Sequence, residues 1–325
     1  MGERVDAVTS AMPKDTLVDS TDLEFEDESN VRGRREIHER IGEMVADHYE
    51  LSRMLGHGGS GAVYAAYDRQ NQRAPVAVKL LHKHLRGVDG HSARFQREIK
   101  ALSEIAHSAV VRVLDSGKDD YGHMYLVMEL LEGELLHEKI ESGLELREIL
   151  EVGRQLLGCL AAAHDRGIVH RDIKPENLFL TRAPGGVIRL KILDWGIAKL
   201  TRPDTAISFQ TLDGLILGTP DYMSPELCRG MPVTEEADLW AAAGVLFHLI
   251  AGVPPFDEEQ IGKLLVRIVK ERAPLLADVS PEVPAYVTSA IDRALDPDRT
   301  KRWQTAREFA TGLATSAPID DLDWD

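Results

Sequence analysis

The hydrophobic pattern of the chain changes near Gly133, and this change constrains the fold more than any other feature. Before it, apolar residues alternate or cluster in short runs that predict β-strands, with one helical stretch over residues 94–105. After it, helical spacing continues to about Leu313. Strands first and helices later are typical of an α+β protein with two lobes. The expected strands cover residues 63–67, 76–81, 110–114 and 124–128.

The two ends of the chain differ from this central part. Residues 1–32 are acidic and poor in aromatic side chains, so we expect a disordered arm, because such a segment buries too little apolar surface to offset its ordering entropy. Residues 33–48 carry apolar residues at helical spacing, which predicts a short amphipathic helix, either packed on the next domain or solvated. These apolar residues are Ile37, Ile41, Met44 and Val45. The acidic tail, residues 314–325, is expected to be frayed.

Composition argues against several classes of protein. The formal net charge of -16 disfavours a nucleic-acid partner. Cys159 and Cys228 lie far apart, which suits a reducing cytosol and gives no metal-binding or redox spacing. Residues 239–256 approach the length of a membrane span, but they contain His248 and two glycines and predict a buried core helix instead. The N-terminal residues lack the apolar segment of a signal peptide, so we expect a cytoplasmic protein without a membrane span.

Two acids, a lysine and an asparagine lie in one short region, from His170-Arg171-Asp172-Ile173-Lys174-Pro175-Glu176-Asn177 to Asp194-Trp195-Gly196. Phosphoryl transfer needs such a set: an Asp to orient a hydroxyl and accept its proton, an Asn and a second Asp to hold Mg²⁺, and a Lys to offset phosphate charge. A single Asp in a loop is usually a turn or helix-capping residue. That alternative does not account for the whole ordered set.

A glycine-rich segment precedes this region, Leu55-Gly56-His57-Gly58-Gly59-Ser60-Gly61-Ala62-Val63. Glycines allow backbone N–H groups to approach phosphates without obstruction by a Cβ atom. A dinucleotide-binding fold would open a helix at the third glycine. Here a strand pattern follows Gly61, so a strand–turn–strand unit is favoured. Lys79 ends the next strand, and Glu98 on the following helix is the acid that could pair with it; taken alone, Lys79 would be a solvated surface charge.

Together these motifs resemble the serine/threonine protein kinases, especially the bacterial, eukaryotic-like members. The catalytic octet, His170 to Asn177, is similar to H-R-D-L-x-x-x-N. The metal-binding triplet, Asp194-Trp195-Gly196, is similar to D-F-G, and the glycine-rich segment is similar to G-x-G-x-x-G-x-V. Lys174 is similar to the serine/threonine type, as is the segment Gly218-Thr219-Pro220-Asp221-Tyr222. The resemblance covers residues 49–313, with Trp195 in place of Phe as the main departure, which we expect to alter packing and not the chemistry.

The resemblance implies a two-lobed kinase fold: an N-lobe of antiparallel strands with one regulatory helix (49–128), a hinge (129–133) and a mainly helical C-lobe (134–313). It implies ATP with Mg²⁺, or Mn²⁺ as an alternative metal. Asp172 and Lys174 would be catalytic, and Asn177 and Asp194 would hold the metal. The nucleotide would be bound by Leu55, Gly56, Gly58, Gly61, Val63, Ala77, Lys79, Glu98, Met128 and Phe179. Structural roles are implied for Glu226 paired with Arg302 and for Asp238 beneath the catalytic loop.

Arg171 precedes the catalytic Asp, and in the family such an Arg often binds a phosphorylated residue of the activation segment. Candidate acceptors for autophosphorylation lie in residues 201–219, with Thr211 as the first choice. Asp213 follows at a position where a second acceptor is expected, so it could partly substitute for phosphate on Arg171. The alternative, a plain turn residue beside Gly214, is favoured.

Three alternatives concern function. A pseudokinase would bind nucleotide and act as a scaffold or switch, and Trp195 is the feature in its favour. An enzyme acting on a small molecule would not need the long segment that ends in Ser224-Pro225-Glu226, which argues for a protein substrate. A metal site of histidines lacks helical spacing and a cysteine partner, so solvated side chains are expected instead. These histidines are His57, His82, His84 and His91.

Overall fold

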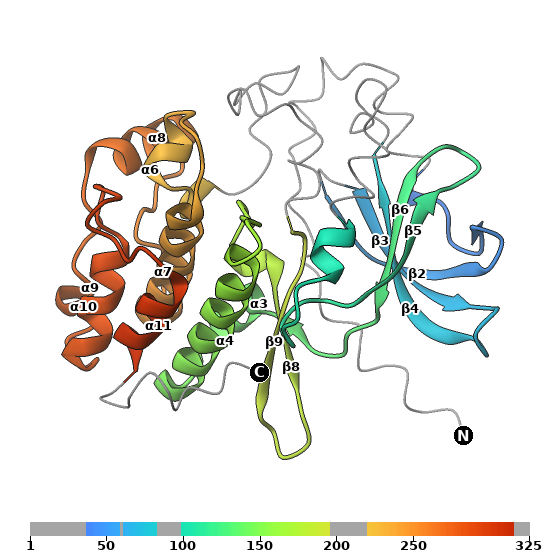
Figure 1. Cartoon of the computed structure of the whole chain (residues 1–325), viewed down its shortest axis with the longest axis horizontal. Coiled ribbons are helices and arrows are strands. Elements are labelled where there is room, and N and C mark those ends of the chain that lie inside the picture. The colour runs from blue at the N-terminus through green and yellow to red at the C-terminus, as the bar shows by residue number, and fades with distance from the viewer. Residues whose placement is uncertain (1–36, 59–60, 83–98, 196–219, 315–325) are drawn as a thin grey trace.

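The computed structural model describes residues 37–58, 61–82, 99–195 and 220–314, and they form two lobes (Figure 1). The N-terminal lobe contains a six-stranded antiparallel sheet with the strand order β1-β2-β3-β4-β6-β5. Of the helix expected over residues 94–105, the structure describes residues 99–105, and residues 99–103 are helical. The strands are β1 Met44–Val45, β2 Tyr49–Gly58, β3 Gly61–Asp68, β4 Ala74–Leu81, β5 Val113–Lys118 and β6 Met124–Glu129.

Alternation along β4 gives this sheet two distinct buried faces, because successive side chains of a strand point to opposite sides. Val78 and Leu80 belong to an outer apolar cluster, together with Tyr64. Ala77 and Leu81 belong to the main core, which continues into the second lobe. Lys79 lies between Val78 and Leu80 and therefore shares the inner face. The strand pattern thus directs the lysine toward the space between the lobes.

The second lobe is mainly helical and contains a small three-stranded sheet in the order β7-β8-β9. The long helices α4 and α7 pack against each other, and α10 and α11 pack on them. The strands are β7 Glu134–Leu135, β8 Leu178–Arg182 and β9 Ile188–Ile192. The helices are α3 Leu136–Ser142, α4 Leu146–His164, α6 Pro225–Cys228, α7 Glu235–Ala251, α8 Ile261–Lys270, α9 Leu276–Val279, α10 Ala285–Ala294 and α11 Ala306–Leu313.

The apolar stretch at 239–256 is a buried core helix, as the sequence predicts. It forms most of α7, where Trp240, Val245 and Phe247 are buried. The helix ends at Gly252, which adopts a left-handed conformation with φ of 75°. Within the described ranges, no helix combines the length and the apolar character needed to cross a membrane.

Most of the predicted strands are confirmed, but one is displaced. The segments 63–67, 76–81 and 124–128 lie in β3, β4 and β6. The strand expected at 110–114 is wrong at both ends, because β5 begins at Val113 and continues to Lys118. Its register is fixed by pairing with β6, and a bulge near Leu114 leaves that side chain 44% exposed.

The helix predicted over 33–48 is also wrong within the described part of this segment. Residues 37–38 are helical, but the chain then turns at Gly42, with φ of 87°, and enters β1. Ala46 and Asp47 have positive φ values of 50° and 60°, which a continuous helix does not allow. The helical spacing is therefore coincidental. Residues 1–36 and 315–325, which include the acidic arm, lie outside the described residues.

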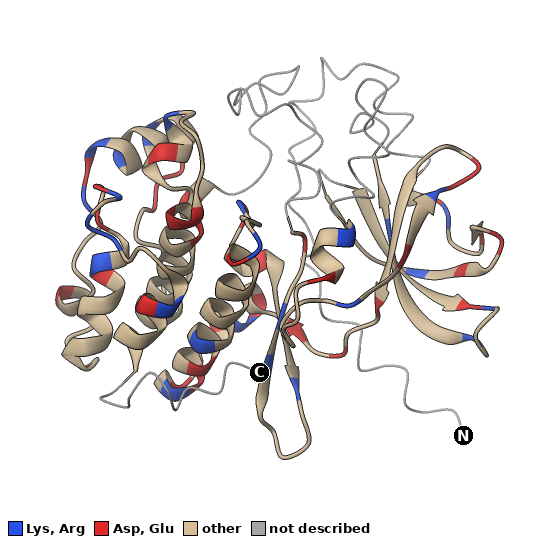
Figure 2. Ribbon diagram, viewed as in Figure 1, with Lys and Arg blue, Asp and Glu red and all other residues tan. Residues whose placement is uncertain are grey.

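Charged residues are dispersed along the ribbons of both lobes (Figure 2). Among the described residues, two Arg–carboxylate pairs are buried on both sides: Arg40 with Asp119 in the first lobe, and Arg302 with Glu226 in the second. Burial alone would raise the pKa of Asp119, but hydrogen bonds from His123 and Arg40 outweigh it and lower the pKa to about 2. The Asp119 carboxylate is therefore a stabilising anion.

We expect this pair to contribute an acid-sensitive share of stability. The pKa of an Asp in an unfolded chain is about 3.9, so a folded value of about 2 adds stability above pH 4 that is lost as the pH falls toward 2. Urea unfolding at several pH values should show a steep loss in this window for the wild type. The loss should be shallower in Asp119→Asn, and equal slopes in the two proteins would contradict the assignment.

Candidate active site

The loop after α4 is held in place by one buried carboxylate. Asp238 on α7 is 1% exposed and accepts hydrogen bonds from the backbone N–H groups of His170 and Arg171, each at 2.8 Å. A third contact comes from His164 at the end of α4, whose Nε2 lies 2.9 Å from the same carboxylate. Arg171 has φ of 66°, a conformation that bulky residues rarely adopt. The expected role of Asp238 is confirmed, whereas no sequence motif indicates His164.

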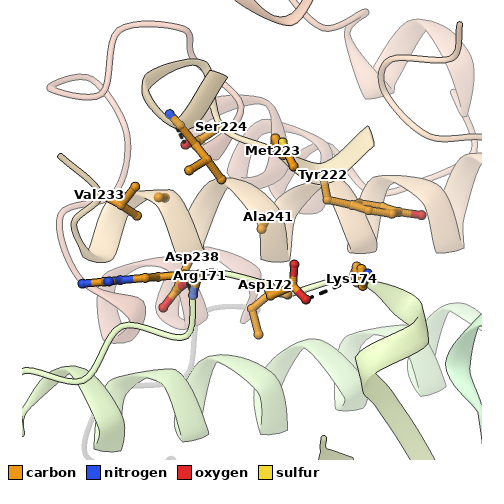
Figure 3. Close-up of a pocket in the computed structure, with 12 residues that line it drawn as sticks. Arg171, Asp172, Lys174, Tyr222, Met223, Ser224, Val233, Asp238 and Ala241 are labelled. Atoms are coloured by element: carbon orange, nitrogen blue, oxygen red, sulfur yellow. Dashed lines mark hydrogen bonds and ion pairs between the residues drawn. The ribbon is translucent and has the colours of Figure 1, made fainter. Parts of the chain in front are cut away.

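This loop brings Asp172, Lys174 and Asn177 together. The amide of Asn177 donates to the backbone oxygen of Asp172 at 2.7 Å and to its carboxylate Oδ2 at 2.9 Å. Lys174 Nζ lies 3.9 Å from the same Oδ2 (Figure 3). A short 3₁₀ helix, η3 Pro175–Asn177, sets the position of the Asn side chain. Both donors engage Oδ2 of Asp172.

Lys79 and Asp194 join the two lobes. Lys79 Nζ lies 2.5 Å from Asp194 Oδ1, although 115 positions separate the two residues in the chain. Lys79 is only 5% exposed, so it is not a solvated surface charge. Asp194 follows β9 with φ of 46°, a left-handed conformation that Asp tolerates better than most residues. Glu98, the expected partner of Lys79, lies outside the described residues.

The donor set fits a hard divalent cation. The side-chain nitrogen of Asn177 donates to Asp172, so its side-chain oxygen, Oδ1, can serve as a metal ligand. Asp194 engages Lys79 through Oδ1 and retains Oδ2. Mg²⁺ prefers oxygen ligands and is usually bound by one or two protein groups together with water and substrate phosphates. No group of three or more His, Cys, Asp or Glu suited to a metal occurs in the described ranges.

The residues proposed to contact the nucleotide lie along the inner face of the first lobe and on β8. Ala77 and Met128 are directly opposite each other on β4 and β6. Leu55 and Val63 are partly buried and pack on the main core, and Phe179 on β8 is 6% exposed. These five side chains come from segments that the sequence separates widely. Val63 lies directly opposite Lys79 on the neighbouring strand, so the apolar inner face adjoins the charged group.

Gly58 and Gly61 of the glycine-rich segment are glycines for different physical reasons. Gly58 has open space where a Cβ atom would be, so a ligand can approach its backbone. Gly61 has φ of 146°, and a Cβ atom there would lie 1.9 Å from the backbone oxygen of Leu80. Close packing of β3 on β4 therefore requires this third glycine, independently of any phosphate. Gly56 pairs with Val63 across the two strands.

Comparison with known proteins agrees with this geometry. The sequence pattern of the protein kinase domain matches residues 49–311. The chain belongs to the protein kinase family. It is 38% identical over 275 residues to "Serine/threonine-protein kinase pkn2" of Myxococcus xanthus, covering 82% of this chain and 32% of that protein. It is 33% identical over 286 residues to "Serine/threonine-protein kinase PrkC" of Bacillus subtilis, covering 87% of this chain and 42% of that protein.

A solved structure gives the same result for the fold. The crystal structure of the Mycobacterium tuberculosis PknI kinase domain matches this chain with a TM-score of 0.64 and 28% sequence identity. The match covers 84% of this chain and 97% of that chain. The resemblance to bacterial serine/threonine kinases and the two-lobed α+β fold are thereby confirmed. This chain spans less than half the length of the pkn2 and PrkC relatives.

A pocket in this kinase lies directly beside Asp172 and Lys174, between the catalytic loop and helices α6 and α7 (Figure 3). Its opposite wall includes Tyr222, from the 3₁₀ helix η4 Pro220–Tyr222, and Met223. Segment 201–219, which includes Thr211 and Asp213, lies outside the described residues.

One wall of this pocket is fixed by a second, unforeseen contact. The hydroxyl of Tyr222 lies 2.7 Å from Nδ1 of His248 on α7, with the two rings stacked. Burial raises the pKa of Tyr222 and lowers the pKa of His248. Both side chains are therefore neutral near pH 7, and one hydrogen bond joins the Tyr hydroxyl to the imidazole nitrogen. In the sequence, His248 indicates only that its segment is not a membrane span.

Trp195, the departure from the family triplet, is 3% exposed and packs against the His170 ring, with 4.9 Å between ring centroids. Its indole N–H has no hydrogen-bond acceptor within the part of the chain that the structure describes. A buried donor without an acceptor costs about 1–3 kcal/mol. The larger ring thus gains packing area and carries a polar penalty.

We expect Trp195→Phe to change the free energy of unfolding by no more than about 1 kcal/mol, because the cavity left behind and the relief of the unpaired N–H act in opposite directions. Trp303→Phe is the control, since its N–H donates to the Ala290 backbone oxygen at 2.9 Å and its loss has no such offset. Urea unfolding of both variants should show the larger loss for Trp303→Phe. The reverse order would show that Trp195 has an acceptor.

The predicted pair of Glu226 and Arg302 is present beneath α6. Arg302 Nη1 and Nη2 lie 2.8 Å and 3.0 Å from the two carboxylate oxygens, and both side chains are almost fully buried. Burial alone would raise the pKa of Glu226, but the hydrogen bonds and charge of Arg302 outweigh it, so the pKa lies below its usual value. Arg302 also donates to the Asp296 backbone and lies over the Trp240 ring. The pair therefore joins α6, α7 and the segment before α11.

Proposed function

We propose that this protein transfers the γ-phosphoryl group of ATP, with Mg²⁺ or Mn²⁺, to serine and threonine hydroxyls of protein substrates. The observation that carries the proposal is the convergence of Lys79, Asp172, Asn177 and Asp194 at the junction of the two lobes. The names of the relatives, serine/threonine-protein kinases, favour the same acceptor. Segment 201–219 is the proposed site of autophosphorylation, with Thr211 as the first choice, and two free cysteines suit a cytoplasmic location.

The proton step is assigned to Asp172. Its carboxylate, which Asn177 holds in place, would accept the proton of a hydroxyl that enters from the adjacent pocket. Lys174 would offset charge on the transferred phosphoryl group, since its Nζ already lies near the Asp172 carboxylate. A divalent cation held by Asn177 and Asp194 would neutralise charge on the phosphates.

Lys79 would change partners during nucleotide binding. It is paired with Asp194 in this structure. With nucleotide bound, Lys79 would pair with the ATP phosphates and with Glu98, and Asp194 would be a ligand of the metal. The inner wall formed by Leu55, Val63, Ala77, Met128 and Phe179 would receive the adenine. Each part of the nucleotide thus has residues of matching chemistry.

The test is phosphoryl transfer by the purified chain incubated with labelled ATP and Mg²⁺, with and without a chelator. Label on serine or threonine that disappears with the chelator supports the proposal. Label on free small molecules, with none on protein, would favour a small-molecule kinase. Absence of label with Mg²⁺, Mn²⁺ or added protein substrates, combined with retained ATP binding, would favour a pseudokinase scaffold. Every catalytic position is filled, which argues against that last outcome.

A further inference from the structure

The segment just before the kinase domain lies on the outer face of the N-lobe sheet. Ile37 and Val45 are fully buried in the outer apolar cluster, and the Tyr64 hydroxyl donates to the Ile37 backbone oxygen. Arg40 is 3% exposed and pairs with buried Asp119. The family match begins at residue 49, so these contacts belong to a segment outside the kinase domain pattern.

This segment reaches the glycine-rich strand through a group of three histidines. The ring of His38 lies 4.6 Å from that of His57 and 6.2 Å from that of His82, measured between centroids. His57 stands between Gly56 and Gly58 in the glycine-rich segment. His82 is 3% exposed, and its Nε2 lies 3.1 Å from the Gly58 backbone oxygen. His82 is therefore not the solvated side chain that the sequence predicts, and His84 and His91 lie outside the described residues.

The geometry places this contact on the side opposite the nucleotide. His57 is directly across from Ala62, whose side chain belongs to the outer cluster with Tyr64. Opposite residues of an antiparallel pair share a face, so His57 points to the outer face. Leu55 and Val63 instead pack on the main core. The histidines can therefore contact the glycine-rich strands on the outer face of the sheet without occupying the proposed nucleotide site on the inner face.

We propose that His38 is a positioning residue for the nucleotide site, holding the glycine-rich strands through His57 and His82. The anchor is firm because Ile37 is buried on one side of His38 and the Arg40–Asp119 pair fixes the chain on the other. At Gly58 itself, nothing in the described residues comes within 4 Å of the place where a Cβ atom would lie. The expected effect on KM for ATP rests on the proposed function. The expected effect on the order of the glycine-rich strands does not.

The structural test is hydrogen exchange of the backbone amides of residues 56–62 in the full chain. His38→Ala should exchange faster there than wild type, and His38→Phe, which keeps the ring contact, should restore protection. His48→Ala is the matched control, because its ring packs on Tyr49 at 4.0 Å, in the same lobe and away from the three histidines. Unchanged exchange in His38→Ala would overturn the proposal, as would equal acceleration in both alanine variants.

The kinetic test compares KM values. His38→Ala should raise KM for ATP about two- to tenfold, the range expected for loss of one ring contact, while kcat and KM for the protein substrate change less. A lower unfolding temperature with an unchanged KM for ATP would show a merely structural role and would overturn the proposal. If the wild type transfers no label at all, the proposed function fails, and hydrogen exchange still decides the role of His38.

Discussion

Replacing Asp172 with Asn is expected to lower the rate of phosphoryl transfer by about 10²–10⁴-fold, the usual contribution of a positioned acid or base. Asn has nearly the same shape, so it can keep a hydrogen bond with Asn177, but it cannot accept the proton of the attacking hydroxyl. ATP binding should persist, because Lys79 and Asp194 are unchanged. The measurement is initial rates of label transfer, with ATP binding followed by its effect on the unfolding temperature.

Asp165→Asn is the matched control for this variant. Asp165 follows α4 in the same lobe and pairs with Arg307 at the surface, where both side chains are about half exposed. The same change of carboxylate to amide there should leave the transfer rate close to that of the wild type. If Asp172→Asn retained about a tenth of the wild-type rate or more, its carboxylate would not be the proton acceptor, and another group facing the pocket would have to take that role.

Local patterns predict the parts of this molecule whose structure depends on neighbours in the chain. The alternation in β3 and β4, the long apolar helix α7 and the order of Asp172, Lys174 and Asn177 all depend on spacings of a few residues. The catalytic octet identifies its chemistry because the set of residue types is unusual at such short range. The pair Glu226 and Arg302 could be named only through the family resemblance, since 76 positions separate them.

The contacts that sequence patterns miss are formed between distant segments. Lys79 meets Asp194 because β4 and β9 converge between the lobes, and nothing near either residue indicates this. Burial of His82 is tolerated because its imidazole forms a hydrogen bond with the backbone carbonyl of Gly58. The segment before β2 was predicted wrongly for a related reason. Its apolar residues have helical spacing, but the segment forms β1, where Val45 is buried on the outer face of the sheet. Burial of that face outweighs local helical propensity.

Replacing Arg302 with Met is expected to lower the free energy of unfolding by about 3–5 kcal/mol, because it leaves the Glu226 carboxylate buried without its partner. Arg307→Met is the matched control. Arg307 also binds a carboxylate through both terminal nitrogens, at 2.8 Å and 2.5 Å, but at the surface. Loss of that exposed pair should cost about 0–1 kcal/mol. The same chemical change in the same lobe thus isolates the effect of burial.

The double variant Glu226→Leu with Arg302→Met separates two causes of this loss of stability. One is the unpaired buried Glu226 carboxylate, and the other is the loss of the remaining contacts of the two side chains. Removing both charges removes the unpaired anion, so the double variant should be more stable than Arg302→Met alone. Urea unfolding midpoints, with slopes checked for constancy, give the comparison. Equal losses for Arg302→Met and Arg307→Met would contradict the buried-pair assignment. A double variant that is less stable than Arg302→Met would show instead that contacts of Glu226 other than Arg302, such as the backbone around α6, provide most of its stabilising effect.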